Sequence, residues 1–137
     1  MTRFTPIATA VALATAATFA IAADPIKIGV NGPFTGGSSS MGVSMRDGVR
    51  LATKEINDAG GVMGRKIELV ERDDEAKNER GVQIAQELVN KEKVTAVVGY
   101  INTGVALASQ RFFQEAKIPV MNNVATGSLV TDRKSVV

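Results

Sequence analysis

The hydrophobic pattern of the chain alternates between short runs of β-forming residues and longer stretches with helical spacing. A first β-rich run at residues 26–30 ends in turn-forming residues and a loop rich in Gly and Ser. Apolar residues then recur every three or four positions, as on a helix that packs against a sheet: Met45, Val49, Ala52, Ile56 and Ala59. Gly60 and Gly61 follow, and they supply the left-handed conformation that ends such a helix.

The same alternation continues to about residue 131. Further strands are expected at residues 67–70, 94–99 and 118–121. Two more helices are indicated by apolar stripes. The first stripe consists of Val82, Ala85 and Val89, with Leu88 beside it, and the second consists of Val105, Ala108, Phe112 and Ala116. Right-handed connections between parallel strands place helices on both faces once the strand order reverses. The sequence therefore predicts a three-layer α/β fold, a parallel sheet flanked by helices.

Composition excludes several classes of chemistry. The 137 residues include neither Cys nor His, so a Ser-His-Asp triad, a thiol nucleophile, a disulfide and the usual zinc sites are ruled out. A net formal charge of +2 gives no electrostatic footprint for nucleic acid. We therefore expect no metal, no cofactor and no nucleic-acid partner. Met41, Met45 and Met63 are interpreted as core fillers.

The first 22 residues form a segment of their own. They carry one charge, Arg3, followed by an apolar run that closes with the cleavage-type triplet Ala20-Ile21-Ala22. An uncleaved membrane anchor needs about 20 strongly apolar residues, and this run is diluted by Ala and Thr. We interpret residues 1–22 as a secretory signal peptide and expect the mature protein outside the cytoplasmic membrane.

Two predicted loops at the carboxyl ends of the strands carry groups that suit a ligand. In a sheet of this kind, ligands bind beyond those ends. Thr103 or Asn102 is expected to begin a helix, where N–H groups favour a carboxylate or phosphate, and residues 122–128 offer further hydroxyls. Simple helix capping explains the same residues. The acidic cluster at residues 73–75 is interpreted as a solvated capping loop rather than a cation or phosphoacceptor site.

Several motifs then occur in a fixed order: Gly32-Pro33-Phe34-Thr35-Gly36, Glu55-Ile56-Asn57-Asp58-Ala59-Gly60-Gly61, Asp73-Asp74, Ile118-Pro119-Val120 and Ala125-Thr126. Together they resemble the opening part of the periplasmic branched-chain amino-acid-binding proteins of ABC transporters. The resemblance covers residues 26 to about 131. It implies the first Rossmann-like lobe of a type I periplasmic binding protein, preceded by a signal peptide, whose two lobes close on the ligand like a hinged trap.

The resemblance also implies roles for five ligand-binding residues. Thr103 would bind the carboxylate of an amino acid through its hydroxyl and amide, and Val124 would offer its carbonyl to the ammonium. Thr126 would reach either group with its hydroxyl. Ile101 would line the pocket for the ligand's side chain, and Met41 stands where the family often has an aromatic residue. That departure leaves the identity of the ligand open.

The implied function is a non-enzymatic solute-binding component of an ABC uptake system in the periplasm. Its ligands would be amino acids or related small carboxylates and amides, and the full-length protein would act as a monomer with a membrane permease complex. The alternative is the ligand-sensing domain of an extracellular receptor on the same fold. A phosphoacceptor receiver domain is disfavoured, because it needs acidic residues where this chain has Asn31 and Tyr100.

Residues 132–137 are predicted to be a non-native tail. A common sequencing adapter, read in frame, encodes the same Asp-Arg-Lys-Ser-Val-Val. A premature stop or a frameshift is the alternative explanation. Residues 23–131 are then an incomplete N-terminal lobe, which we expect to be unable to bind ligand tightly alone.

Overall fold

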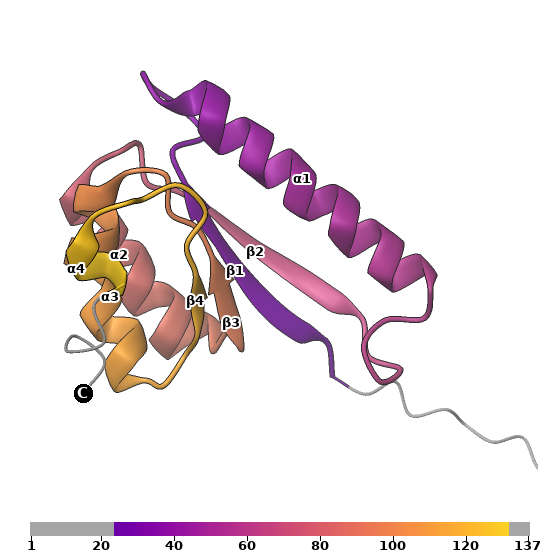
Figure 1. The fold of residues 1–137 in the computed structure, drawn as a ribbon. Helices are drawn as coiled ribbons and strands as arrows, with labels where there is room; N and C mark the ends of the chain where they lie inside the picture. The colour runs from indigo at the N-terminus through magenta and orange to yellow at the C-terminus, as the bar shows by residue number, and fades with distance from the viewer. Residues whose placement is uncertain (1–23, 132–137) are drawn as a thin grey trace, which may run out of the picture.

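The computed structural model describes residues 24–131, and the predicted signal peptide and tail lie outside them. Four strands alternate with helices along the chain: β1 (Ile26–Gly32), α1 (Ser39–Asp58), β2 (Ile67–Asp73), α2 (Asn78–Glu87), the π-helical turn η1 (Leu88–Glu92), β3 (Ala96–Val98), α3 (Thr103–Glu115), β4 (Val120–Met121) and α4 (Ser128–Thr131). Helices cover both faces of the sheet, with α1 on one side and α2, α3 and α4 on the other (Figure 1). The predicted three-layer α/β fold is confirmed.

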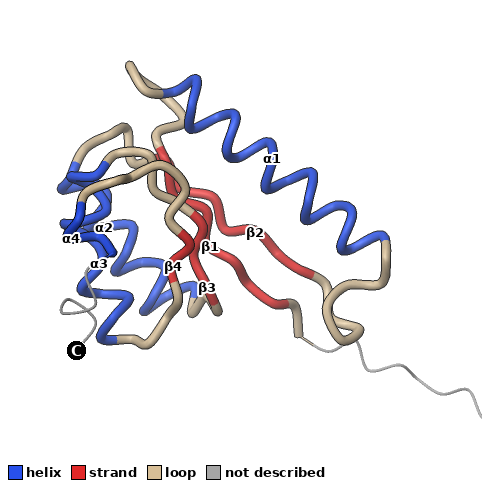
Figure 2. Tube along the Cα trace, viewed as in Figure 1, coloured by secondary structure: helices blue, strands red, loops and turns tan. Residues whose placement is uncertain are grey.

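The sheet is parallel throughout and has the order β2-β1-β3-β4. β1 is central, because Ile28 pairs with Leu69 of β2 on one side and with Ala96 of β3 on the other. Its second half is buried, as expected for a strand with neighbours on both sides. The strands run in the same direction, so their carboxyl ends and the loops that follow them gather at one end of the sheet (Figure 2).

The core lies between the sheet and the pair α2 and α3, and two details of the predicted core are wrong. Leu88, expected beside the stripe, is fully buried, and in α3 the buried aromatic ring is Phe113 rather than Phe112. The cause is the close approach of the two helices at Gly81. A Cβ there would collide with Val105 and come within 3.0 Å of the Ser109 hydroxyl, so α3 turns that face toward α2.

Helix α1 packs only through the first part of its predicted stripe. Met45 and Val49 are half-buried, whereas Ile56 is 40% exposed and its neighbours Ala52 and Ala59 are exposed as well. The main contacts of the helix within the described chain are with β1 and β2. Polar contacts hold it there instead. Arg50 binds Glu71 of β2 through two hydrogen bonds of 2.7 and 2.6 Å.

Two of the methionines that we interpreted as core fillers are also exposed, Met41 at 49% and Met63 at 95%. Met63 lies in the tight turn between α1 and β2, where no part of the core reaches it. Over residues 24–131, no helix combines the length and the apolar content that crossing a bilayer demands.

Candidate functional site

A cavity of about 530 Å³ lies at the carboxyl end of the sheet, where the start of α1 meets the loops that follow two of the strands. Its lining combines the first two turns of α1 with the loops after β3 and β4: Ser40, Met41, Ser44, Met45, Ile101, Asn123 and Val124. Three of the five predicted ligand residues, Met41, Ile101 and Val124, therefore lie at one cavity. Every lining side chain is uncharged, which suits the aliphatic part of a small ligand better than an ionic one.

Four lining residues were not among the five predicted ligand residues, although Asn123 lies in the predicted loop 122–128: Ser40, Ser44, Met45 and Asn123. The sequence pattern placed Ser40 in a flexible loop, whereas α1 already begins at Ser39. Ser40 and Ser44 are four residues apart and so lie on one face of that helix, the same face as Met41. The four-residue spacing of the two serines was the signal in the sequence that could have placed them on one helix face.

The start of α1 is fixed in place by its contact with Pro33. A Cβ at Gly42 would collide with the carbonyl group of Pro33, which is backbone and cannot move aside as a flexible side chain can. Gly42 is the single buried residue of α1. The absence of a side chain therefore lets the first turn of the helix, with Met41, approach the end of β1.

We expect Gly42→Ala to lower the free energy of unfolding by about 1–3 kcal/mol, because the extra methyl group forces the backbone apart. The matched control is Gly48→Ala in the same helix, where nothing lies within 4 Å of the added Cβ. That substitution should instead stabilise by up to about 1 kcal/mol, since Ala is the better helix former. Urea denaturation checks both. Equal effects of the two substitutions would contradict the contact with Pro33.

Asp73 fastens the loop between β1 and α1 to the end of β2. Its Oδ1 accepts hydrogen bonds from the amides of Phe34 (2.8 Å) and Glu75 (3.0 Å), and its Oδ2 accepts one from the Thr35 hydroxyl (2.6 Å). Partial burial raises the pKa of Asp73, but these hydrogen bonds outweigh it and keep the pKa below the usual value of an aspartate. Asp73 is therefore a charged acceptor that holds two loops together.

Its neighbour Asp74 behaves differently, and the prediction of a solvated acidic loop is wrong for it. The side chain is fully buried, and burial raises its pKa to about 6, against a lowering hydrogen bond from the Ala76 amide (2.9 Å) and with a further rise from the charge of Asp73. In the described part of the chain, no three acidic side chains are grouped so that they could hold a metal ion.

The loops after β3 and β4 lie side by side. α3 begins at Thr103, and Asn102 in the N-cap position makes no hydrogen bond from its side chain to the helix amides. The methyl group of Thr103 faces Gly127, next to the exposed Thr126. The structure thus brings Thr103 beside the loop that carries Val124 and Thr126. Whether these residues bind a ligand stays a prediction.

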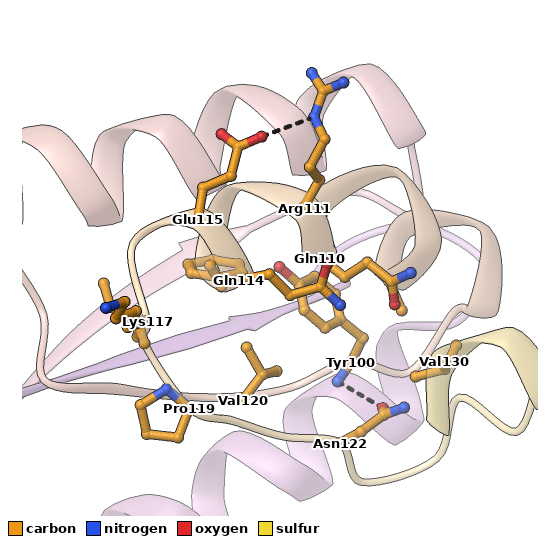
Figure 3. Close-up of a pocket in the computed structure, with 13 residues that line it drawn as sticks. Tyr100, Gln110, Arg111, Gln114, Glu115, Lys117, Pro119, Val120, Asn122 and Val130 are labelled. Carbon is orange, nitrogen blue, oxygen red and sulfur yellow. Dashed lines mark hydrogen bonds and ion pairs between the residues drawn. The ribbon is translucent and has the colours of Figure 1, made fainter. Parts of the chain in front are cut away.

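A second, larger hollow of about 1,120 Å³ lies beside β4 (Figure 3). Its wall is formed by the second half of α3, by β4 and by α4, with Phe113, Ile118 and Val130 among the apolar residues. It includes none of the five predicted ligand residues. β4 is the edge strand of the described sheet, so this hollow is a groove along an edge rather than a site built from loops.

Comparison with known families and sequences gives consistent results. Residues 25–136 match the model of a family described as periplasmic binding protein. The chain is 32% identical over 131 residues to the leucine-, isoleucine-, valine-, threonine- and alanine-binding protein of Pseudomonas aeruginosa, and the match covers 96% of this chain and 35% of that protein. The chain spans 29–35% of the length of the first curated relatives that it matches.

Two solved structures place the same fold in substrate-binding proteins. The branched-chain amino acid transporter substrate-binding protein from Streptococcus pneumoniae, in complex with isoleucine, matches with a TM-score of 0.75 and 34% identity, over 78% of this chain and 31% of that one. A solute-binding protein of an ABC transporter from Rhodopseudomonas palustris BisB5, in complex with 3,4-dihydroxybenzoic acid, matches with a TM-score of 0.72 and 32% identity, over 79% and 29% respectively.

Proposed function

This chain belongs to the periplasmic binding protein family, and we propose that it forms the first lobe of a solute-binding component of an ABC uptake system. The proposed ligands are branched-chain amino acids or related small carboxylates and amides, which it captures without chemical change. One observation carries the proposal. The first turn of α3 receives no capping hydrogen bond from a side chain, and it lies near an uncharged, largely aliphatic cavity. The free N–H groups of a helix start suit a carboxylate, and the cavity suits an aliphatic side chain.

Each of the five residues then contacts a different part of the ligand or shares a part with one other residue. Thr103 binds the carboxylate with its hydroxyl and its amide at the positive end of the α3 dipole. Val124 offers its carbonyl to the ammonium, while its own amide donates to the carbonyl of Tyr100 (3.2 Å) and so fixes the loop. Thr126 contributes a hydroxyl from the same loop. Ile101 and Met41 contact the ligand's side chain.

We propose the same cellular role as for the proteins in the two solved structures above, whose names describe substrate-binding and solute-binding proteins of transporters. The full-length protein is then non-enzymatic, and its signal peptide directs export and is cleaved after residue 22. In the periplasm the full-length protein acts as a monomer that delivers its ligand to a membrane permease complex. The ligands in the two structures above, isoleucine and 3,4-dihydroxybenzoic acid, share a carboxylate. The proposed carboxylate site at Thr103 therefore suits both of these ligands.

Titration of the 137-residue chain with isoleucine, followed by NMR, tests the site. We expect amide shifts confined to residues 101–104 and 122–127 and to the start of α1. Calorimetry with leucine, isoleucine or valine should show no sub-micromolar affinity, because ligand sites normally bury about 70–90% of the ligand and one lobe covers only one side of it.

The control variant is Thr103→Val, which keeps the shape of the side chain and removes its hydroxyl. We expect it to lose most of the shifts at residues 101–104 without a change in thermal stability. Sub-micromolar binding by the unaltered chain would contradict the proposal that one lobe is insufficient. Shifts centred elsewhere, or shifts that Thr103→Val leaves unchanged, would contradict the assigned site.

A further inference from the structure

Four polar side chains are buried together beneath the loops that carry the candidate ligand site. They are Asn31, Asp74, Tyr100 and Ser109, and none is more than 1% exposed. Asn31 lies at the end of β1, Asp74 and Tyr100 follow β2 and β3, and Ser109 lies in α3. None of the four is a predicted ligand residue, although Tyr100 also lines the larger hollow beside β4. We refer to them as the buried polar cluster.

Five polar atoms of this cluster have no hydrogen-bond partner in the described structure: Asn31 Oδ1 and Nδ2, Asp74 Oδ2, the Tyr100 hydroxyl and Ser109 Oγ. Buried polar groups are rarely left in this state, because each unpaired group costs free energy. The groups nevertheless influence one another. Ser109 and Asn31 lower the pKa of Tyr100, while burial, as the larger cause, and the charge of Asp74 raise it, to about 12 overall. Apart from the hydrogen bond that Asp74 Oδ1 accepts from the Ala76 amide, the polar atoms of the four side chains therefore face each other without settled hydrogen bonds.

Asp74 is the member whose charge changes near neutral pH. The titratable groups that act on it are Asp73 from its own loop and Tyr100 from the end of β3. Among the described residues of the cluster, β1 and α3 contribute only the uncharged Asn31 and Ser109. Among residues 24–131, no cation contributes to the pKa of Asp74, so its ionisation must be met by reorienting the donors around it: the hydroxyls of Tyr100 and Ser109 and the amide of Asn31.

The backbone of Tyr100 connects this cluster to both loops of the candidate site. Its carbonyl accepts hydrogen bonds from the amides of Val124 and Ala125, each at 3.2 Å. Its amide donates to Asn122 Oδ1 (3.2 Å), as Figure 3 shows, and the Asn122 side chain closes the loop by donating to the Ala125 carbonyl (2.8 Å). Any reorientation of Tyr100 therefore acts on residues 101–103, which follow it, and on residues 122–125.

We propose that the buried polar cluster is a pH-sensitive positioning device, in which ionisation of Asp74 moves Tyr100 and, through its backbone, the two loops of the candidate site. Asp74 and Tyr100 are positioning residues and need not touch the ligand. The importance of the device for ligand capture rests on the proposed function. The device itself is a property of the unliganded chain and is tested without a ligand.

Tyr100 is the only tyrosine of the chain, which has no tryptophan, so its spectroscopic signal reports on this site alone. We expect the ring carbons of Tyr100, followed by NMR, to show one transition between pH 5 and pH 7. The amides of Val124 and Ala125 should shift with the same midpoint, and so should the carboxyl carbon of Asp74. In Asp74→Asn the transition should be lost at all of these positions. In Asp73→Asn, which alters the adjacent carboxyl, it should remain.

A Tyr100 signal that is flat from pH 5 to pH 7 in the unaltered chain would overturn the proposal. So would a transition that persists in Asp74→Asn, or one that Val124 and Ala125 do not share. The Asp74 carboxyl resonance is measured in the unaltered chain, so the test survives poor folding of a variant. Because no ligand is added, failure here leaves the titration with isoleucine unaffected, and failure of that titration leaves this result standing.

Discussion

Replacing Phe113 by Ala is expected to lower the free energy of unfolding by about 3–5 kcal/mol, the usual cost of deleting a buried aromatic ring. Phe113 is 1% exposed and belongs to the main core cluster with Leu88, Val97 and Val105. Removal of its ring leaves a cavity that α3 and the sheet can close only by moving toward each other, and such collapse is normally incomplete. Urea denaturation followed by circular dichroism measures the loss.

The preceding residue supplies a matched control. Phe112 is the same residue type one position earlier in the same helix, but it is only partly buried against the core, and Arg111 lies over its ring at 5.5 Å. We expect Phe112→Ala to cost less than about half as much. Equal losses for the two variants, or a larger loss for Phe112→Ala, would show that α3 faces the sheet as the sequence pattern suggested.

The second large effect is the dependence of stability on pH through Asp74. Burial raises its pKa from 3.8 to about 6. The folded protein thus favours the neutral carboxyl. The folding stability that this preference contributes is fully present below about pH 4 and is lost as the pH rises through about 6. Asp74→Asn stays neutral at every pH. Its advantage over the unaltered chain should grow by about 3 kcal/mol between pH 4 and pH 8.

Asp73→Asn is the control, because the effect of pH on stability through Asp73 has the opposite sign. The pKa of Asp73 lies below its usual value, so its charge stabilises the folded chain above the unfolded pKa, and that contribution is lost as the pH falls through the folded pKa. This variant should be less stable than the unaltered chain at pH 8 and should approach it in acid. Unfolding curves at several pH values measure both variants. Parallel curves for Asp74→Asn and the unaltered chain would contradict the burial of an ionisable Asp74.

The alternation of strands and helices was predictable because a parallel sheet covered on both faces needs apolar runs separated by helical stripes. Which row of a helix faces the core was less predictable. Phe112 and Phe113 both continue a spacing of three or four residues, and the choice between them depends on the contact of α3 with Gly81, which lies in a different helix. Periodicity within one segment contains no information about that contact.

The candidate site shows the same limit. Motif resemblance found Met41, Ile101 and Val124, which the structure brings to one cavity, but the burial of Asp74 was not recognised. Asp73 and Asp74 are adjacent in sequence, and successive side chains at a strand end point in opposite directions. One carboxyl therefore meets the loop after β1 while the other enters the core. Residue type alone does not distinguish Asp73 from Asp74, because both are aspartates.

The strand order also bears on how the lobe acquires its fold. β1 is the first strand of the described chain and yet one of the two interior strands of the sheet, and its neighbours pair with it at Leu69 and Ala96. During synthesis it must wait, unpaired, until residues far along the chain have been made. Contacts between such distant segments carry a loop-closure cost before they give any stabilisation, and they slow folding. The sheet of this lobe is thus a late product of folding, whereas α1 is complete in sequence before any strand can find a partner.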